Sequence, residues 1–189
     1  MLRPGVKWLA ARGVTANQVT VFACLASMAV GVVLCQRSEK WFLILPPFLF
    51  LRMALNAVDG MLAREFGQKS NLGAYLNELS DVIADSFLYV PFAYLPRFNP
   101  LWIGVVIVLA VISEMTGAIG VMIGSSRRYD GPMGKSDRAL VFGALALYIG
   151  LGGPVSPHFP HVFLIVMTAL LAWTIVNRVR KGLAGLRIT

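Results

Sequence analysis

The sequence predicts an all-α integral membrane protein with six transmembrane helices, preceded by an N-terminal amphipathic helix at the membrane surface. Hydrophobic residues make up 57% of the 189 residues and charged residues only 14%, and the mean hydropathy is +0.71. A soluble domain carries about a quarter charged residues. The composition therefore places the chain among membrane proteins and leaves no separate soluble domain.

Six apolar runs define the expected spans. A helix needs about 20 apolar residues to cross a bilayer, and a crossing segment must be helical because lipid offers the backbone no hydrogen-bond partners. The fifth run is the shortest and contains Gly143 and Gly150. We expect one polytopic domain, residues 1–189, with an interfacial segment at 1–16 and spans at 19–35, 41–62, 72–95, 101–123, 139–151 and 159–176.

The basic residues predict the orientation of this domain. With both termini in the cytoplasm, only Arg37, Lys40 and Arg97 fall on outside loops. The excess on the inner side is typical of multi-pass membrane proteins and explains the net charge of +8 without nucleic-acid binding. The cytoplasmic set is Arg3, Lys7, Arg12, Arg64, Lys69, Arg127, Arg128, Lys135, Arg138, Arg178, Arg180, Lys181 and Arg187.

Carboxylate and amide side chains concentrate where the second expected span ends and the third begins. Asn56 and Asp59, three residues apart, share a helix face. Asn77 and Asp81, four apart, share a face of the next helix, and an antiparallel hairpin brings the two faces together. Converging oxygen ligands suit Mg²⁺ or Mn²⁺. The pattern predicts a metal site of these four residues, and the neighbouring Arg64 suits a diphosphate.

Further acids lie on or beside the same spans. Glu65 is interpreted as the partner of a nearby arginine, and Glu78 is expected to turn about 100° away from the site face. Asp85 lies one turn deeper in the membrane, where it either supports the site or joins two helices. Glu114, in "VISEMTGAIG", is either functional, the default for an intramembrane acid, or a polar contact between helices.

The hairpin resembles the signature of the CDP-alcohol phosphatidyltransferase family, D-x2-D-G-x2-A-R, about eight residues, then G-x3-D-x3-D. This chain has Asn56-x2-Asp59-Gly60-x2-Ala63-Arg64, eight residues, then Gly73-x3-Asn77-x3-Asp81. The stretch "GVTANQVT" resembles the family's Pro-Asn-x-x-Thr motif, with Ala16 in place of the proline. Because the six-span layout also agrees, the resemblance extends over nearly the whole chain.

The resemblance implies a CDP-alcohol phosphotransferase-like fold and a reaction. CDP-diacylglycerol would give its phosphatidyl group to an alcohol acceptor and release CMP, with Mg²⁺ or Mn²⁺ as cofactor. It also implies the bacterial inner membrane and a homodimer. Asp59 would be a metal ligand, and Asp81 would be the base that deprotonates the acceptor while also touching metal. The implied CDP site comprises Gly60, Ala63, Arg64, Gly73, Asn17 and Thr20.

Two asparagines depart from the signature, because Asn56 and Asn77 stand where the family has its first and third aspartates. An asparagine offers a metal its carbonyl oxygen but brings no charge. Two carboxylates balance one divalent ion, so we predict one tightly held metal, with any second ion arriving on the CDP diphosphate. Two alternatives stay open: an inactive homologue that binds a nucleotide lipid, and an ion or proton transporter that uses the intramembrane acids.

The longest cytoplasmic loop, "GSSRRYDGPMGKSDR", bears on the acceptor. We expect its Arg127, Arg128, Lys135 and Arg138 at the mouth of the site, where they suit a phosphorylated alcohol such as a glycerol phosphate or an inositol phosphate. The alternative is that these charges only set topology. Arg52, one turn before the first asparagine, could reach the same cavity.

Overall fold

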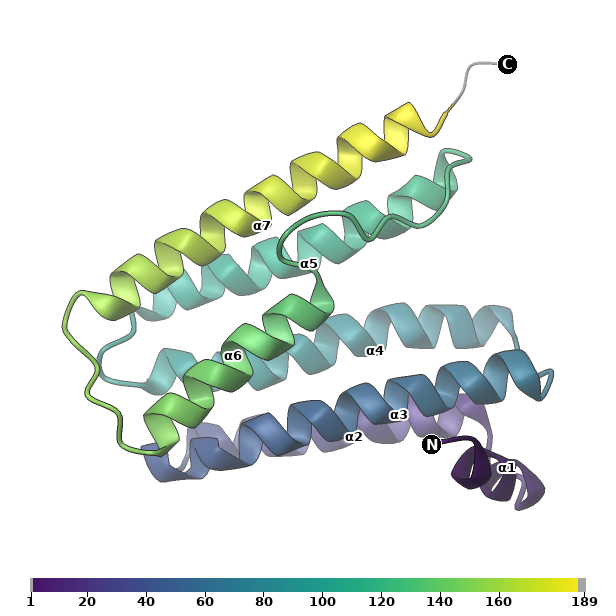
Figure 1. The fold of residues 1–189 in the computed structure, drawn as a ribbon, viewed down its shortest axis with the longest axis horizontal. Coiled ribbons are helices and arrows are strands. Elements are labelled where there is room, and N and C mark those ends of the chain that lie inside the picture. The colour runs from purple at the N-terminus through teal and green to yellow at the C-terminus, as the bar shows by residue number, and fades with distance from the viewer. Residues whose placement is uncertain (1, 187–189) are drawn as a thin grey trace.

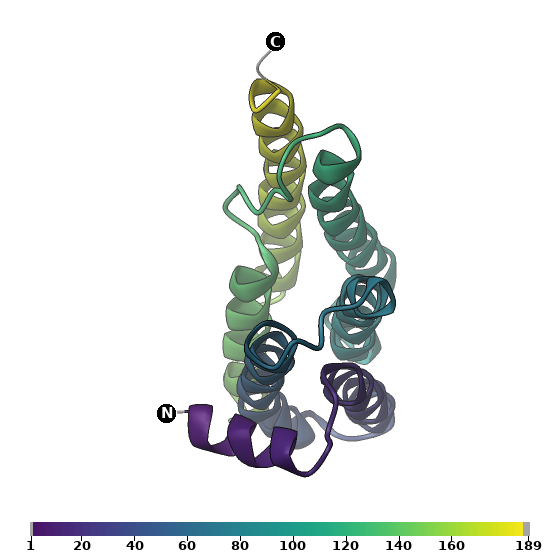
Figure 2. The same cartoon turned by 90° about the vertical axis from the view of Figure 1, so that its right-hand side faces the viewer.

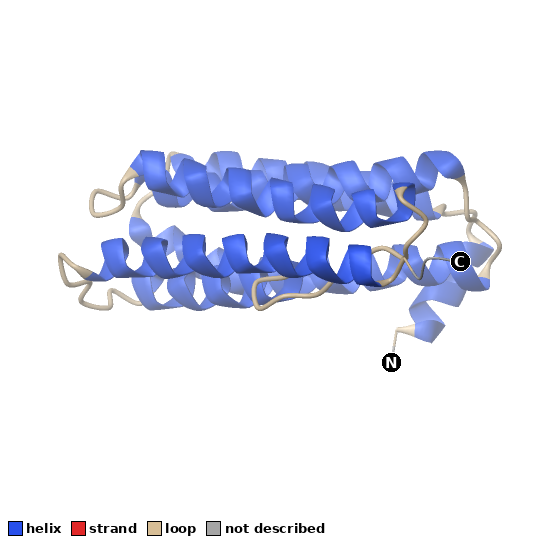
Figure 3. Ribbon diagram, turned by 90° about the horizontal axis from the view of Figure 1, so that it is seen from above, coloured by secondary structure: helices blue, strands red, loops and turns tan. Residues whose placement is uncertain are grey.

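Helices form all the regular secondary structure in residues 2–186, the part of the chain that the computed structural model describes (Figure 1 and Figure 3). Arg187, one of the expected cytoplasmic charges, lies outside these residues. The elements are α1 (Arg3–Ala11), α2 (Ala16–Cys35), the 3₁₀ helix η1 (Glu39–Ile44), α3 (Leu45–Glu65), α4 (Asn71–Tyr89), the 3₁₀ helix η2 (Val90–Tyr94), α5 (Pro100–Met122), α6 (Lys135–Gly150) and α7 (Phe159–Ala184).

Several helices begin at residues that cap them. Thr15 and Gln18 form a capping box at the start of α2, each side chain accepting a hydrogen bond from the backbone N–H of the other. Ser70 and Asn99 cap α4 and α5 by accepting backbone N–H groups of the first turn. The Ser70 cap fixes where the hairpin between α3 and α4 ends, and hence the residue at which α4 begins beside the candidate site.

The expected spans all fall on helices, and four helical segments are apolar and long enough to cross a membrane: Ala16–Cys35, Glu39–Glu65, Pro100–Met122 and Phe159–Ala184. Among the other long helices, α4 carries three carboxylates and α6 has 16 residues. The helix α6 begins four residues before the expected span at 139–151, because the Asp137 carboxylate accepts the N–H of Gly134 and caps it. The expected run at 72–95 is divided by η2, which contains Pro91.

The six long helices are arranged in two layers. Figure 2 shows α3, α6 and α7 along one side and α2, α4 and α5 along the other, with α1 lying across the end of the lower pair. In Figure 1, α1, the turn between α3 and α4, the end of α5 and the end of α7 lie at the same end of the bundle. The segments that the sequence predicts to be cytoplasmic are therefore gathered at one end.

The apolar core is strongest at the opposite end, where η1, η2, α6 and α7 meet. Tyr89 and Phe142 stack with ring centroids 4.0 Å apart, and Phe92 lies 5.1 Å from Phe142. All three side chains are fully buried. Apolar packing thus holds one end of the bundle together and leaves the polar residues to the end that carries α1.

Candidate active site

A cavity of about 590 Å³ lies between α2, α3 and α4 at the end that carries α1. Asp59, Asn77 and Glu78 line it. All six residues that the resemblance assigned to CDP also line it: Gly60, Ala63, Arg64, Gly73, Asn17 and Thr20. The capped hairpin thus brings the family motif and the "TANQVT" segment, which are distant in sequence, onto the same surface.

Asp59 is buried in the wall of this cavity, with 5% of its surface exposed. The Thr20 hydroxyl donates to its Oδ2 at 2.8 Å. No lysine or arginine within residues 2–186 forms an ion pair with it. The guanidinium of Arg64 lies over Gly60, where a Cβ would be only 3.0 Å from its Nη2. Asp59 is therefore a buried carboxylate that faces a polar cavity and forms no ion pair in the part of the chain that the structure describes.

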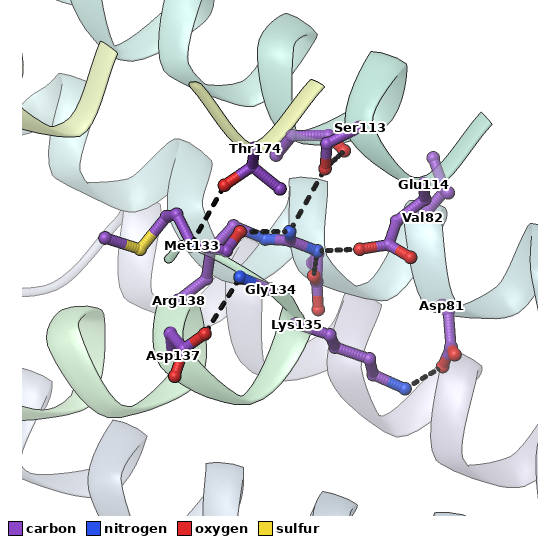
Figure 4. Close-up of polar contacts among 12 residues, drawn as sticks. Asp81, Val82, Ser113, Glu114, Met133, Gly134, Lys135, Asp137, Arg138 and Thr174 are labelled. Carbon is purple, nitrogen blue, oxygen red and sulfur yellow. Dashed lines mark hydrogen bonds and ion pairs between the residues drawn. The ribbon is translucent and has the colours of Figure 1, made fainter. Parts of the chain in front are cut away.

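Asp81 differs, because nitrogen donors surround its Oδ1. Asn56 Nδ2 donates to it at 3.3 Å, and Arg52 Nη2 lies 3.5 Å away. Lys135 Nζ, from the first turn of α6, forms an ion pair with the same oxygen (Figure 4). Arg52 also donates to the Asp81 backbone carbonyl at 3.1 Å, but it does not line the cavity that Asp59 faces, which it was expected to reach.

A second cavity of about 360 Å³ adjoins the first. Asn77 lines both cavities, and Asp81 lines the second. Arg127, Lys135 and Arg178 contribute positive charge to the second cavity from the α5–α6 connection, α6 and α7. The face of α4 that carries the motif therefore separates a motif-lined cavity from a second one, which is lined by these three basic residues and by the carboxylates Asp81, Glu114 and Asp137.

The oxygen donors of this region fit one hard divalent cation. Within residues 2–186 no three His, Cys, Asp or Glu side chains gather closely enough to hold a metal. Asp59, which forms no ion pair among the described residues, can supply the charged donor, and Asn77, in the wall of the same cavity, can supply an amide oxygen. Asn56 lines neither cavity and turns its amide nitrogen to Asp81, which leaves its amide oxygen unbonded to that carboxylate. Asp81 already has an ammonium against its carboxylate, so the donor set does not fit two equivalent ions.

A buried ion-pair network lies deeper in the bundle. Asp85 on α4 accepts from Arg52 on α3 at 2.5 Å and from Arg138 on α6 at 2.9 Å. Glu114 on α5 accepts from Arg138 at 2.9 Å and lies 3.4 Å from Arg178 on α7. None of these side chains is more than 7% exposed. Of the two readings left open for Asp85 and Glu114, the geometry favours contacts that join helices.

The position expected for Arg138 at the mouth of the site is wrong, because the α5–α6 connection folds back into the bundle (Figure 1). Met133, a residue of this connection, is buried, and its backbone N–H donates to the Thr174 hydroxyl at 3.0 Å. Gly131 adopts a φ of 128° and packs against Thr174, where a side chain would clash. Arg138, in the first turn of α6, consequently lies inside the bundle and donates to the Ser113 hydroxyl and the Glu114 carboxylate (Figure 4).

Arg128 also departs from expectation, since it lines neither cavity. It pairs with Asp130 at 2.8 Å, and Lys181 pairs with the same carboxylate at 2.9 Å. The hydrogen bond from Lys181, aided by the charge of Arg128, holds the pKa of Asp130 below its ordinary value. Arg128 therefore belongs to a surface cluster that fastens the connection to α7.

Two site residues were missed or misplaced by the sequence. Glu78 was expected to turn away, yet it lines the first cavity and accepts from Arg127 at 2.5 Å. Arg178 was counted only as a cytoplasmic charge, but it is 2% exposed and donates to the Ser113 carbonyl. A signal for Arg178 existed, because its position continues the apolar face of the last helix.

The expected partner of Glu65 is Arg3, 3.5 Å away.

The fold and site define a helical membrane protein with a carboxylate-lined polar cavity at one end. The model of the CDP-alcohol phosphatidyltransferase family matches residues 13–176, and the chain belongs to this family. It is 42% identical over 184 residues to the inner membrane protein YnbA of Escherichia coli, covering 97% of this chain and 91% of that protein. It is 32% identical over 93 residues to the phosphatidylinositol phosphate synthase of Streptomyces avermitilis, covering 49% and 37%.

Solved structures of the phosphatidylinositol phosphate synthase from Mycobacterium tuberculosis share the fold. The complex with manganese and citrate superposes with a TM-score of 0.81 at 18% identity, covering 99% of this chain and 91% of that one. The structure with CDP-DAG bound gives a TM-score of 0.80 at 19% identity, covering 97% and 94%. The helical arrangement of this chain is therefore the same as in these solved structures.

The ion-pair network predicts a large stability difference between two matched substitutions. Asp85→Asn leaves Arg52 and Arg138 buried without their shared carboxylate, so we expect the free energy of unfolding to fall by about 3–5 kcal/mol. Asp130→Asn removes the same charge from a more exposed cluster and should cost less than about 1 kcal/mol. Thermal unfolding of the purified variants in detergent measures both, and equal shifts would contradict the role given to the network.

Proposed function

We propose that this protein transfers the phosphatidyl group of CDP-diacylglycerol to an alcohol acceptor and releases CMP. The observation that carries the proposal is the position of Asp81 in the wall of a cavity that holds Arg127, Lys135 and Arg178 and adjoins, at Asn77, the cavity lined by the family motif. Family membership supports the reaction class. The structure of the M. tuberculosis enzyme with CDP-DAG bound supports the donor.

In this proposal the first cavity receives the CDP part of the donor. Gly60 and Gly73 line this cavity and leave room for the side chains of Arg64 and Asn17 to lie over them, where those polar groups can meet the nucleotide. Mg²⁺ or Mn²⁺, held by Asp59 with the amide oxygens of the two motif asparagines, would supply positive charge to the diphosphate. The manganese complex of the M. tuberculosis enzyme supports a cofactor of this kind.

Asp81 acts as the base. It takes the proton of the acceptor hydroxyl, whose oxygen forms a bond to the phosphorus of the phosphatidyl group while the bond from that phosphorus to CMP breaks. The carboxylate is 19% exposed and lines the second cavity, so an acceptor in that cavity can reach it. Asparagine at the first and third motif positions lowers the charge of the metal site but leaves this base in place.

We propose that the acceptor is a phosphorylated alcohol. Arg127, Lys135 and Arg178 line the second cavity, and guanidinium and ammonium groups bind phosphate oxygens with charge-assisted hydrogen bonds. The relatives named as phosphatidylinositol phosphate synthases support an acceptor of this class. Arg128 and Arg138 are left out of the acceptor site because neither lines either cavity.

We also propose that all six long helices cross the bacterial inner membrane, with both termini and the site on the cytoplasmic side and α1 lying on the surface. The name of the E. coli relative supports the location. The three carboxylates of α4 each pair with a basic side chain from another element, so this helix can sit inside the bundle despite its charge. A homodimer stays a prediction.

Release of CMP tests the reaction. We expect the purified protein, with labelled CDP-diacylglycerol, Mn²⁺ and a panel of free and phosphorylated alcohols, to release CMP. Asp81→Asn and Asp59→Asn should lower the rate by about 100-fold or more, whereas Asp130→Asn, outside both cavities, should leave it unchanged. If no acceptor gives CMP above the Asp81→Asn level, the enzyme proposal fails. Binding of the donor without turnover would then identify an inactive homologue.

Labelling of single cysteines tests the topology. In a variant lacking Cys24 and Cys35, a membrane-impermeant maleimide applied to spheroplasts should label Ser38→Cys and Ser156→Cys. Ser126→Cys should react only after the membrane is opened. If α4 and α6 did not cross, the α5–α6 connection would lie outside, and Ser126→Cys would react at once.

A further inference from the structure

The two carboxylates of the proposed site differ in what neutralises them. Asp59 and Asp81 lie on facing helices, and both belong to the motif. Asp59 accepts a hydroxyl hydrogen bond and has no ion-pair partner in the described part of the chain. The Oδ1 of Asp81 forms an ion pair with the Lys135 ammonium and accepts a hydrogen bond from the Asn56 amide. One carboxylate is therefore open to a cation, and the other already has one.

Lys135 is held in this position by the surrounding structure. It is the first residue of α6, and its backbone neighbour Gly134 is capped by Asp137 at 2.9 Å. One turn along the helix, Arg138 is anchored in the buried network. The lysine side chain is 27% exposed and can meet Asp81 because the α5–α6 connection folds inward. The contact thus follows from the buried architecture rather than from a mobile surface side chain.

A divalent ion placed at Asp81 would stand beside this ammonium and beside Arg52, whose Nη2 is 3.5 Å from the same oxygen. Like charges at such distances repel strongly where water is limited. The motif asparagines also remove the negative charge that would offset the repulsion. A second metal therefore has neither the ligands nor the electrostatic environment that it needs at this carboxylate.

We propose that Lys135 takes the place of a second divalent cation, so that the site holds one metal at Asp59 and a built-in ammonium at Asp81. The inference deepens the proposed function and rests on it for the role of the site. A lysine ammonium has three donors on a flexible stem. When the phosphorylated acceptor enters the second cavity, Lys135 can turn from Asp81 to one of its phosphate oxygens, and this movement leaves the carboxylate free to accept the acceptor's proton.

Counting bound Mn²⁺ tests this proposal without any substrate. The full-length protein, purified in detergent and freed of metal, is titrated with Mn²⁺ while electron paramagnetic resonance measures the free ion. We expect the wild type to bind about one ion per chain. Lys135→Arg keeps the positive charge and should behave in the same way. So should Lys7→Met, which removes a lysine from exposed α1, on the same end of the bundle.

Lys135→Met is the decisive variant, because it leaves Asp81 without its ammonium. We expect it either to bind about two ions per chain or to bind Mn²⁺ about tenfold more tightly. The proposal is overturned if the wild type binds two ions or none, or if Lys135→Met keeps both the number and the affinity of the wild type. If Lys135→Met does not fold, the number of Mn²⁺ ions bound per wild-type chain alone tests the proposal. Failure of the proposed function is seen separately, as absence of CMP release by the wild type whatever its Mn²⁺ count.

Discussion

Two carboxylates buried between helices constrain the rest of this molecule. Asp85 and Glu114 can remain ionised in a low-dielectric interior only if cations meet them. Arg52, Arg138 and Arg178 supply these cations from three other helices. To deliver Arg138, the α5–α6 connection must turn back into the bundle, and that turn carries Lys135 to Asp81. The geometry of the candidate site is therefore a consequence of buried charges, of which Asp85, Arg52 and Arg138 line neither of its two cavities.

The candidate site consists of two adjoining cavities, to which we assign different binding roles. The first cavity uses small residues and a buried carboxylate, features suited to a diphosphate with one metal. The second combines two arginines and a lysine with carboxylates, among them Asp81, and these features suit a phosphorylated alcohol that must lose a proton. Because Asn77 lines both cavities, donor and acceptor would meet across one helix face. The acids Asp85 and Glu114 are fully committed to arginines, which makes an ion or proton relay the weaker alternative.

Much of the site could be predicted from local spacing. Asn56 and Asp59, or Asn77 and Asp81, share a face because the α-helical repeat requires it, and a short hairpin must bring those faces together. Partners far apart in sequence could not be found in this way. Arg138 donates to Asp85, which is 53 residues away in the sequence, and Arg127 donates to Glu78, which is 49 residues away. The inward path of the α5–α6 connection depends on Gly131 and Met133 packing against α7, and the helical repeat of the sequence does not predict this packing. For that reason the four basic residues that the sequence predicted together at the mouth of the site lie in three different environments.

The account as a whole requires that cells containing this protein make a lipid that depends on Asp81. The most direct measurement compares the membrane lipids of cells that overproduce the wild type with those of cells that overproduce Asp81→Asn at the same level. Quantitative mass spectrometry should find a phosphatidyl-linked product that rises with the wild type and stays at background with the variant. Identical lipid profiles in the two strains, with both proteins folded in the membrane, would contradict the account.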